Sequence, residues 1–487
     1  MQRLCQLFMF LYVTVSVTLA AHADTLTADI AVIGGGSAGF AAAWSAATLG
    51  SRVVLVEKAS MLGGTSTYAG VCNWEPGMGG TGVPYRVYQR LKKIHNCCGL
   101  YVIDRHCSWK KPSEPYTFPG GILKIDPSLP YWRSLLRHGP GMGNEAWFRE
   151  HCHGVIYEPR CLARVMGDML RESGTCTTLL NTAFTKAAHS DGTVTSITLS
   201  NGDVVRATIF IDATDAALCA QLGCQLMFGR DARSAFNEPG APTEPQATLN
   251  GATLIFRVTP VETPEVEPLP DGIPEKSWWG GFAYVFVETF PNGDLGLNML
   301  PTMKGQEVFA MGVDEAYTEC KRRVYAEWHW LQTTYEEFRH FRLKEIAPVL
   351  ALRETRRVVG EYVLNQNDLI AGLSGQTHPD IIAIADHPMD NHGGGGPSGE
   401  LKEEYGIPYR CLLPKGTENV LIAGRAASFS SIAASSCRLS RTMMQLGEAA
   451  GVAAHLAVTQ KVPLRSVPAD QIRQTMVRHI DGNPYAE

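Results

Sequence analysis

The sequence predicts an α/β fold built on a doubly wound parallel sheet, which an inserted, strand-rich domain interrupts. The first observation is a β-α-β pattern over residues 29–57, where two short apolar runs flank an Ala-rich stretch. The second is another apolar run, 207–215, that returns to the sheet, and the third is a shift to Pro-rich composition near Gly229. At roughly 100 to 200 residues per domain, a chain of 487 residues allows two to four folding units.

The composition excludes several classes of protein. Hydrophobic residues make up 45% and charged residues 19%, with 48 glycines and 28 prolines, so the chain is neither disordered nor collagen-like. The formal net charge is -5, so no overall basic field attracts nucleic acid or an anionic membrane. We therefore expect no nucleic-acid partner.

The first 23 residues have the pattern of a secretory signal peptide. Arg3 precedes an apolar stretch from Leu7 to Leu19, and Ala21 and Ala23 supply the small residues that signal peptidase accepts. The alternative is an uncleaved anchor, but the apolar stretch is shorter than the roughly 20 residues that a membrane-spanning helix needs. We expect a secreted or periplasmic protein without a stable membrane span.

Removal of this segment leaves twelve of the thirteen cysteines, in a compartment where disulfides persist. Six of them lie within residues 72–161, close to four histidines, but no pair has the Cys-x-x-Cys spacing of a structural zinc site. We expect disulfides or buried thiols and no metal, with a pairing that the sequence leaves open. The six are Cys72, Cys97, Cys98, Cys107, Cys152 and Cys161.

The most informative segment is a Gly-x-Gly-x-x-Gly motif between a predicted strand at 29–33 and a predicted helix at 40–49. In such a motif the first glycine allows a tight turn, the second lets a pyrophosphate approach the backbone, and the third lets helix and strand pack closely. The helix N-terminus adds oriented N–H groups and partial positive charge. The candidate binding residues are Gly34, Gly36, Ser37, Ala38 and Gly39.

Glu57 ends the second predicted strand, 52–56, where a carboxylate accepts hydrogen bonds from ribose hydroxyls. The same carboxylate would repel a 2'-phosphate. The segment therefore predicts an adenine dinucleotide, FAD or NAD, in preference to NADP.

Three further segments carry a resemblance to a known family. Residues 57–70 resemble the extended signature of flavin enzymes of the glutathione-reductase and fumarate-reductase-like superfamily, in which a Gly-Gly turn follows the ribose-binding Glu. The Ala-Thr-Asp that ends at Asp215 and the block from Gly406 to Gly451 match later motifs in the same order. On these motifs the chain is identified as a member of the FAD-dependent oxidoreductases, which implies a Rossmann-like FAD-binding domain with an inserted substrate domain.

The resemblance also implies how the cofactor is held. FAD is expected to bind non-covalently, because no residue of Thr65 to Thr67 forms the histidyl-flavin bond of some relatives. The start of a helix around Gly447 is expected to present backbone N–H groups to the flavin N1/O2 edge. The cofactor-binding residues implied are Lys58, Gly64, Thr65, Ser66, Ala213, Asp215, Gly424, Arg425, Gly447 and Ala449.

The expected domain organisation is discontinuous. An excursion over residues 71–152 is expected to cover the flavin. The division is 1–23 signal peptide, 24–228 first part of the FAD-binding domain, 229–345 inserted substrate domain, 346–460 second part of the FAD-binding domain, and 461–487 C-terminal tail.

Two residues are the candidates for chemistry. His392 precedes a run of four glycines, where a ligand can approach closely, and is a candidate base or hydrogen-bond donor. Arg438 stands where fumarate-reductase-like members carry a substrate-binding Arg, but the residues around it depart from their pattern, which puts a dicarboxylate substrate in doubt. At least one arginine of the cluster Arg353, Arg356 and Arg357 is expected to pair with a nearby carboxylate such as Glu354.

Aromatic residues allow two interpretations. Trp278, Trp279, Trp328 and Trp330 are either core residues or a stacking platform for a flat ligand. The predicted function is hydride transfer between a small organic substrate and flavin N5, with an unknown electron donor or acceptor. The alternatives are a protein that retains the flavin without turnover and a protein that binds NAD.

Overall fold

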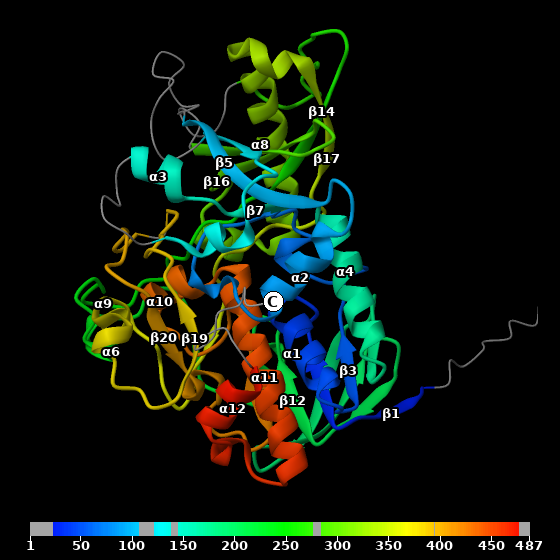
Figure 1. Ribbon diagram of the computed structural model, residues 1–487, viewed down its shortest axis with the longest axis vertical. Helices are drawn as coiled ribbons and strands as arrows, with labels where there is room; N and C mark the ends of the chain where they lie inside the picture. Colours follow the sequence, from blue (N-terminus) through cyan, green and yellow to red (C-terminus); the bar gives the residue numbers. More distant parts are fainter. Residues whose placement is uncertain (1–22, 107–120, 138–144, 276–283, 394, 477–487) are drawn as a thin grey trace, which may run out of the picture.

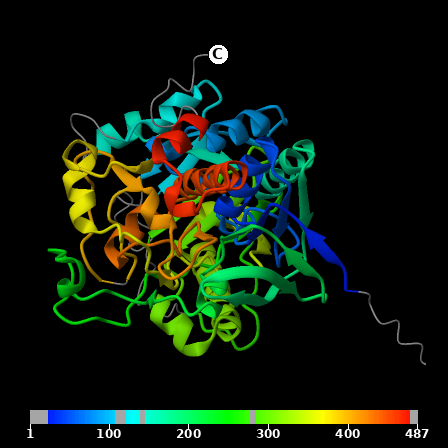
Figure 2. The same ribbon diagram turned by 90° about the horizontal axis from the view of Figure 1, so that it is seen from below.

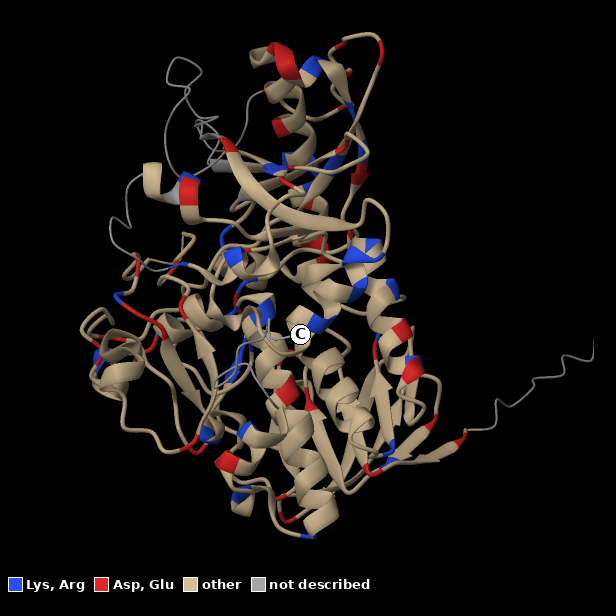
Figure 3. Ribbon diagram, viewed as in Figure 1, with Lys and Arg blue, Asp and Glu red and all other residues tan. Residues whose placement is uncertain are grey.

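The computed structural model describes residues 23–106, 121–137, 145–275, 284–393 and 395–476 (Figure 1). The predicted signal peptide, Trp278 and Trp279 therefore lie outside the described residues. Within these ranges, every helix is too short or too polar to span a bilayer. Acidic and basic residues are interspersed over the fold (Figure 3), in keeping with the small net charge.

A five-stranded parallel sheet confirms the predicted α/β class and the Rossmann-like arrangement. The chain adds strands on one side of β2 and then on the other, giving the order β21-β12-β2-β3-β8. This is the doubly wound order, with its switch point between β2 and β12. Short runs that are mostly apolar and β-branched explain why β2, β3, β12 and β21 are strands buried on both faces, whereas the edge strand β8 is only partly buried. The strands are β2 (Ile30–Ile33), β3 (Val53–Val56), β8 (Cys176–Leu179), β12 (Ile209–Asp212) and β21 (Val420–Ile422).

Two Ala- and Gly-rich helices, α1 (Ser37–Thr48) and α11 (Ser440–Gln460), lie side by side against this sheet (Figures 1 and 2). Their backbones approach closely because α11 presents Gly447 to Ala38 and Gly451 to Ala42. A Cβ on either glycine would overlap the carbonyl oxygen of the facing alanine. The pair forms part of the largest apolar core.

A second, mixed sheet of eight strands forms the upper part of the molecule in Figure 1, where the long helix α8 (Val313–Thr334) packs on it. Four of its strands come from the predicted insertion, namely β14 (Phe256–Pro260), β15 (Tyr284–Thr289), β16 (Leu295–Leu300) and β17 (Phe341–Ile346). The other four are β4 (Asn73–Trp74), β5 (Cys98–His106), β6 (Gly121–Ile125) and β7 (Val155–Tyr157).

The sheet topology differs from the expected division of the chain in one respect. Strands β4 to β7 belong to the same sheet as β14 to β17, because β6 pairs with β15 in parallel. Sequence order placed them with the first sheet, whereas long-range strand pairing joins them to the second.

Smaller elements complete the fold. Strands β1 (Thr25–Thr27), β9 (Phe184–Ser190), β10 (Thr193–Leu199) and β11 (Val204–Arg206) form a four-stranded sheet, and β19 (Ile381–Ala385) pairs with β20 (Tyr405–Pro408). The remaining helices include α2 (Val83–Lys92), α3 (Glu145–His151), α4 (Pro159–Glu172), α5 (Ala217–Gln221), α6 (Arg233–Phe236), α7 (Gly305–Met311), α9 (Gln366–Gly375), α10 (Ser431–Cys437) and α12 (Ala469–Met476). The loop between β19 and β20 carries His392.

The cysteines include one disulfide, between Cys97 and Cys161, which ties α4 to the segment before β5. The sequence left this pairing open. The free cysteines among the described residues are Cys72, Cys98, Cys152, Cys176, Cys219, Cys224, Cys320, Cys411 and Cys437.

Glu288 on β15 makes the stability of the protein depend on pH. Its side chain is 1% exposed, and Asn73 donates to Oε1 over 2.8 Å while Oε2 has no partner among the described residues. Burial raises the pKa of Glu288 from 4.5 to about 8, so the folded state holds the proton more tightly than the unfolded state. The stabilisation is complete below pH 4.5 and is lost as the pH rises to about 8.

Glu288→Gln is therefore expected to reduce the fall in unfolding free energy between pH 5 and pH 8 by about 1–3 kcal/mol. Urea denaturation at the two pH values measures this difference. Glu345→Gln on β17, which replaces a carboxylate that is 48% exposed, is the control and should leave the pH dependence unchanged. Equal pH dependence in wild type and Glu288→Gln would contradict the assignment.

Candidate functional site

Two glycine-rich turns form a cradle at the switch point of the parallel sheet. Gly34 follows β2 with a φ of +97°, and a Cβ on it would lie 2.7 Å from the carbonyl oxygen of Ala213, which follows β12. A Cβ on Gly39 would overlap the carbonyl oxygen of Gly34, so this glycine permits the close contact of helix and strand. A Cβ on Gly36 would have nothing within 4 Å, so the cradle is open at this residue.

The first turn of α1 supplies hydrogen-bond donors to the cradle. Gly36 is its N-cap, no side chain caps it, and its first turn holds no acidic residue. The first N–H groups of a helix lack acceptors within the helix and carry partial positive charge. The Ser37 hydroxyl lies 3.1 Å from that of Ser66, which donates to the Ser440 hydroxyl over 2.7 Å. This set of donors fits the phosphate groups of a dinucleotide.

The second turn packs its backbone directly on the first. Gly63 donates its N–H to the carbonyl of Gly35 over 2.8 Å. A Cβ on Gly64, whose φ is +52°, would lie 3.2 Å from the Cα of Gly36. Thr65 follows in the same turn and accepts a hydrogen bond from the N–H of Val71. The cradle is thus made of backbone that a side chain on either turn would crowd.

Glu57 lies beside the cradle at the end of β3. Its Oε2 accepts from the N–H of Gly35 over 2.6 Å, and its Oε1 accepts from the N–H of Ala59 over 2.7 Å. These bonds fix the carboxylate in the place where the sequence predicts a ribose contact. Lys58, the next residue, is exposed.

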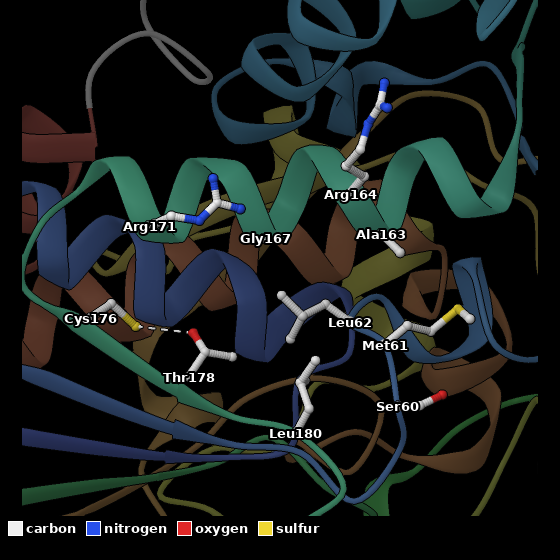
Figure 4. Close-up of a pocket in the computed structure, with 10 residues that line it drawn as sticks. All are labelled: Ser60, Met61, Leu62, Ala163, Arg164, Gly167, Arg171, Cys176, Thr178 and Leu180. Atoms are coloured by element: carbon white, nitrogen blue, oxygen red, sulfur yellow. Dashed lines mark hydrogen bonds between the residues drawn. The ribbon is translucent and has the colours of Figure 1, made fainter.

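A cavity of about 440 Å³ lies next to this segment, between α4 and the edge strand β8 (Figure 4). Leu62, Met61 and Ser60 border it on one side, and Arg164 and Arg171 border it from α4. None of the residues that line this cavity belongs to the charged groups described below.

Four predicted residues lie on the far side of α1, after β12 and β21. Ala213 backs Gly34, as described above, and Gly424, with a φ of +97°, lies against Ala38. The Asp215 carboxylate accepts from the Thr355 hydroxyl over 2.9 Å and from Arg425 over 3.4 Å. The structure thus brings three segments far apart in the sequence around the N-terminus of α1.

Gly447 and Ala449 lie elsewhere than expected. Helix α11 begins at Ser440, so the N–H groups of its first turn belong to residues 440–442 and not to the region of Gly447. Both residues are buried inside the helix, where Gly447 contacts α1. The expectation of a helix start at Gly447 is wrong, because small residues within a helix that packs on another helix have the same pattern as small residues at a helix start.

The candidate catalytic residues meet at one carboxylate, that of Asp390. Its Oδ2 lies 2.6 Å from Nε2 of His392 and 2.8 Å from Nη2 of Arg438. His392 is 22% exposed, Asp390 28% and Arg438 12%, so solvent reaches all three. Burial alone would raise the pKa of Asp390, but the hydrogen bond from His392 and the charge of Arg438 hold this pKa far below its usual range.

His392 is neutral at pH 7. Burial lowers its pKa to about 4, the charge of Arg353 acts in the same direction, and the hydrogen bond to Asp390 only partly opposes them. The backbone N–H of His392 donates to the side chain of Asn250 over 2.8 Å, which fixes the loop. A neutral imidazole bonded to a carboxylate is the form that accepts a proton.

A second group of charges adjoins the first. Nε2 of His387 lies 3.2 Å from Oε2 of Glu75, and Arg137 lies 3.6 Å from the same oxygen and 3.0 Å from Oε1 of Glu400. Burial would raise the pKa of Glu75, yet His387 and then Arg137 lower it to about 2. Asp390 also acts electrostatically on Glu75, so the two groups are neighbours.

Sequence reasoning did not identify Glu75, His387, Arg137 or Glu400 as site residues. They come from three separate segments, since His387 and Glu400 share the loop between β19 and β20, and they belong to no local motif. Asp390 stands two residues before His392, and this spacing is the one local signal that could have paired them.

The cluster and the cradle are connected through α11. Ser440, which accepts the hydrogen bond of Ser66, begins this helix, and Arg438 precedes it by two residues. The candidate catalytic residues and the candidate dinucleotide cradle are therefore joined by one short segment of the chain.

Of the three clustered arginines, Arg357 is structural. It is fully buried and pairs with Glu354 and with Asp231, while its remaining donors reach the carbonyls of Gly229 and Phe429. The expected pairing with Glu354 is confirmed.

Trp328 is a core residue. It is 3% exposed, packs edge-on against Phe256 and Phe338, and donates its Nε1–H to Glu267. It is therefore no stacking platform.

Comparison with known proteins relates the chain to one protein family and to several solved structures. The family model described as FAD dependent oxidoreductase matches residues 29–476. No curated protein shows significant similarity to the chain.

Three of the similar solved structures have low identity to this chain. One is a geranylgeranyl bacteriochlorophyll reductase-like protein from Thermoplasma acidophilum, with 11% identity over 93% of this chain and 82% of that chain and a TM-score of 0.45. Another is PqsL, a probable FAD-dependent monooxygenase from Pseudomonas aeruginosa, with 11% identity over 92% of each chain and a TM-score of 0.38. A myxobacterial chondrochloren halogenase has 11% identity over 92% of this chain and 79% of that chain and a TM-score of 0.43.

Proposed function

Since this chain belongs to the FAD dependent oxidoreductase family, we propose that it transfers hydride between a small organic substrate and FAD, with His392 as the acid-base group. The chain is an enzyme and its cofactor is FAD. The proposal adds three points to this: the transfer of hydride, a small organic substrate, and His392 as the acid-base group.

The residues that would hold FAD are those of the cradle. The N–H groups of Ser37, Ala38 and Gly39 and the hydroxyls of Ser37 and Ser66 would bind its phosphates, and Glu57 would accept from its ribose. FAD, when bound, accepts or gives a hydride, while the protein supplies orientation, charge and proton transfer. Thr65, Ser66 and Thr67 in the second turn support non-covalent binding, because none of them has the ring nitrogen that a histidyl bond requires.

The hydrogen bonds of His392 define which nitrogen takes a proton. An ionised carboxylate accepts hydrogen bonds only, so Nε2, at 2.6 Å from Asp390, carries the hydrogen. Nδ1 is then the lone-pair nitrogen, and no described residue donates to it. We propose that Nδ1 takes a proton from the substrate when the substrate is oxidised and returns it in the reverse reaction.

Arg438 and Asp390 support this role. Arg438 keeps Asp390 ionised, and Asp390 in turn orients the imidazole and stabilises its charged form after proton transfer. In this proposal Arg438, which lies beside Asp390, orients the substrate. The observation that carries the proposal is that His392 and Arg438 share the carboxylate of Asp390. Arg438 stands two residues before α11, the helix whose first residue, Ser440, accepts a hydrogen bond from Ser66 of the cradle.

An anaerobic spectral screen tests the proposed function. The purified holoenzyme is expected to be yellow, and a substrate among sugars, hydroxy acids or unsaturated acids is expected to bleach or restore the visible flavin bands. Anaerobic titration with each compound measures this change. A protein that retains FAD but whose spectrum no compound changes would support the alternative of a flavin-retaining protein without turnover.

We also propose that the protein is exported. The apolar stretch after Arg3 and the Cys97–Cys161 disulfide support this location, because disulfides persist in oxidising compartments. N-terminal sequencing of the mature protein should start near Asp24. A mature chain that still begins at Met1 would contradict export by cleavage.

A further inference from the structure

One arginine near His392 has no carboxylate partner. Arg353 donates through Nη1 to the carbonyl of Gly251 over 2.9 Å and to the hydroxyl of Thr253 over 2.7 Å. Its Nε and Nη2 have no acceptor among the described residues, and its side chain is partly exposed. By contrast, Arg137 and Arg438 each form ion pairs. A guanidinium with two free donors is therefore available to a ligand.

Arg353 lies beside the proposed base. The N–H of Gly251, whose carbonyl accepts from Arg353, donates to the carbonyl of His392 over 2.8 Å. Arg353 and Arg438 also act on the pKa of His392, and both lower it. Arg353 thus belongs to the same group of residues as Asp390 and His392.

The positive charge near Arg353 is not fully paired with carboxylates of the described residues. Burial lowers the pKa of Arg353 to about 9, and the positive charge of Arg438 adds to this effect, while Asp390 and Glu75 oppose it. Asp390 already accepts from two partners, and Nε of Arg438 is buried without an acceptor among the described residues. Arg353 remains charged at pH 7, and a partly exposed guanidinium without an anionic partner is available to bind an anion.

We propose that Arg353 binds a carboxylate of the substrate, so that the substrate class is a small organic acid. This inference rests on the proposed function. The carboxylate would accept from Nε and Nη2 of Arg353 as a bidentate pair, which is the geometry in which a guanidinium binds a planar anion. It would remain chemically unchanged and would hold the reacting carbon beside His392.

Neighbouring arginines do not provide the same contact. All three guanidinium nitrogens of Arg357 already donate to Glu354, Asp231 or two backbone carbonyls. Arg356 is exposed. Arg356→Gln is therefore a control that removes the same charge from the same segment without removing the proposed contact.

Titration of the holoenzyme with matched acids and amides tests this inference. Acetate and succinate are the charged probes, and acetamide and succinamide are their neutral counterparts. The readouts are the visible spectrum of bound FAD and the melting temperature, neither of which needs turnover. We expect the acids to bind and the amides not to bind. Arg353→Gln should weaken the binding of the acids by at least about tenfold, Arg353→Lys less, and Arg356→Gln not at all.

Each outcome has one meaning. Equal binding of acids and amides, no effect of either acid on wild type, or unchanged acid binding in Arg353→Gln overturns the inference, even if another substrate reduces the flavin. Arg353-dependent acid binding without any flavin reduction by the compounds of the spectral screen overturns the proposed function and leaves the anion site in place. If Arg353→Gln does not fold, Arg353→Lys decides: binding equal to that of wild type counts against the bidentate contact.

Discussion

His392→Gln is expected to lower the rate of substrate-dependent flavin reduction by about 100- to 10,000-fold, the contribution of a positioned acid-base group. Glutamine keeps an N–H that can donate to Asp390 but provides no imidazole nitrogen to take a proton. The content of FAD and the melting temperature should stay at the wild-type values, because the cradle does not include His392. Rapid anaerobic mixing followed at the visible flavin bands measures the rate.

A second histidine provides the control. His378 bonds to Asp368 over 2.8 Å and is 14% exposed, so it resembles His392 in partner and burial, but it lies by α9, away from the cluster. His378→Gln should leave the rate unchanged. Equal rates in His392→Gln and wild type would remove His392 from the mechanism.

The same experiment has a pH signature. With a pKa of about 4, His392 takes a proton as the pH falls through this value and can no longer act as a base. The oxidation rate of wild type should therefore fall below about pH 4 and be level near neutral pH, and the residual rate of His392→Gln should lack this acid limb.

Gly36→Ala is expected to weaken FAD binding by about 10- to 100-fold while the apoprotein keeps its fold. Apart from its chain neighbours, no atom of the described residues lies within 4 Å of the added Cβ, so the methyl group is expected to meet a ligand in the cradle. The ratio of flavin absorbance to protein absorbance after dialysis measures retention, and the melting temperature of the apoprotein measures folding.

Gly167→Ala is the matched control. Gly167 lies in α4, where a Cβ also has nothing within 4 Å, and alanine is the better helix former. This variant should retain FAD fully. If Gly36→Ala retains FAD as well as Gly167→Ala does, the pyrophosphate does not approach Gly36.

Local patterns account for what the sequence predicted correctly. The strands before and after the glycine motif, the helix between them and the place of Glu57 follow from short-range periodicity and turn chemistry, and the structure has β2, α1 and β3 there. Small residues do not indicate by themselves whether a segment is the start of a helix or the contact face of one. Gly447 fits a helix start or a helix contact equally well in the sequence, and only the packing of α11 on α1 distinguishes them.

The division of the chain shows the same limit on a larger scale. Strands β4 to β7 lie in the sequence between β3 and β8 of the first sheet, but β6 pairs with β15, which lies more than a hundred residues later. Pairing between distant strands depends on the closure of long loops and on burial of the shared face, neither of which a local window contains.

By itself, the sequence determined the α/β class and the glycine-rich turns, because each rests on a contiguous pattern, and it offered His392 and Arg438 as candidates for chemistry. Only the tertiary structure decided that these two share Asp390 and that Arg357 is neutralised while Arg353 is not. The physical reason is that the charge state and free donors of a side chain depend on which distant groups are brought within about 4 Å of it.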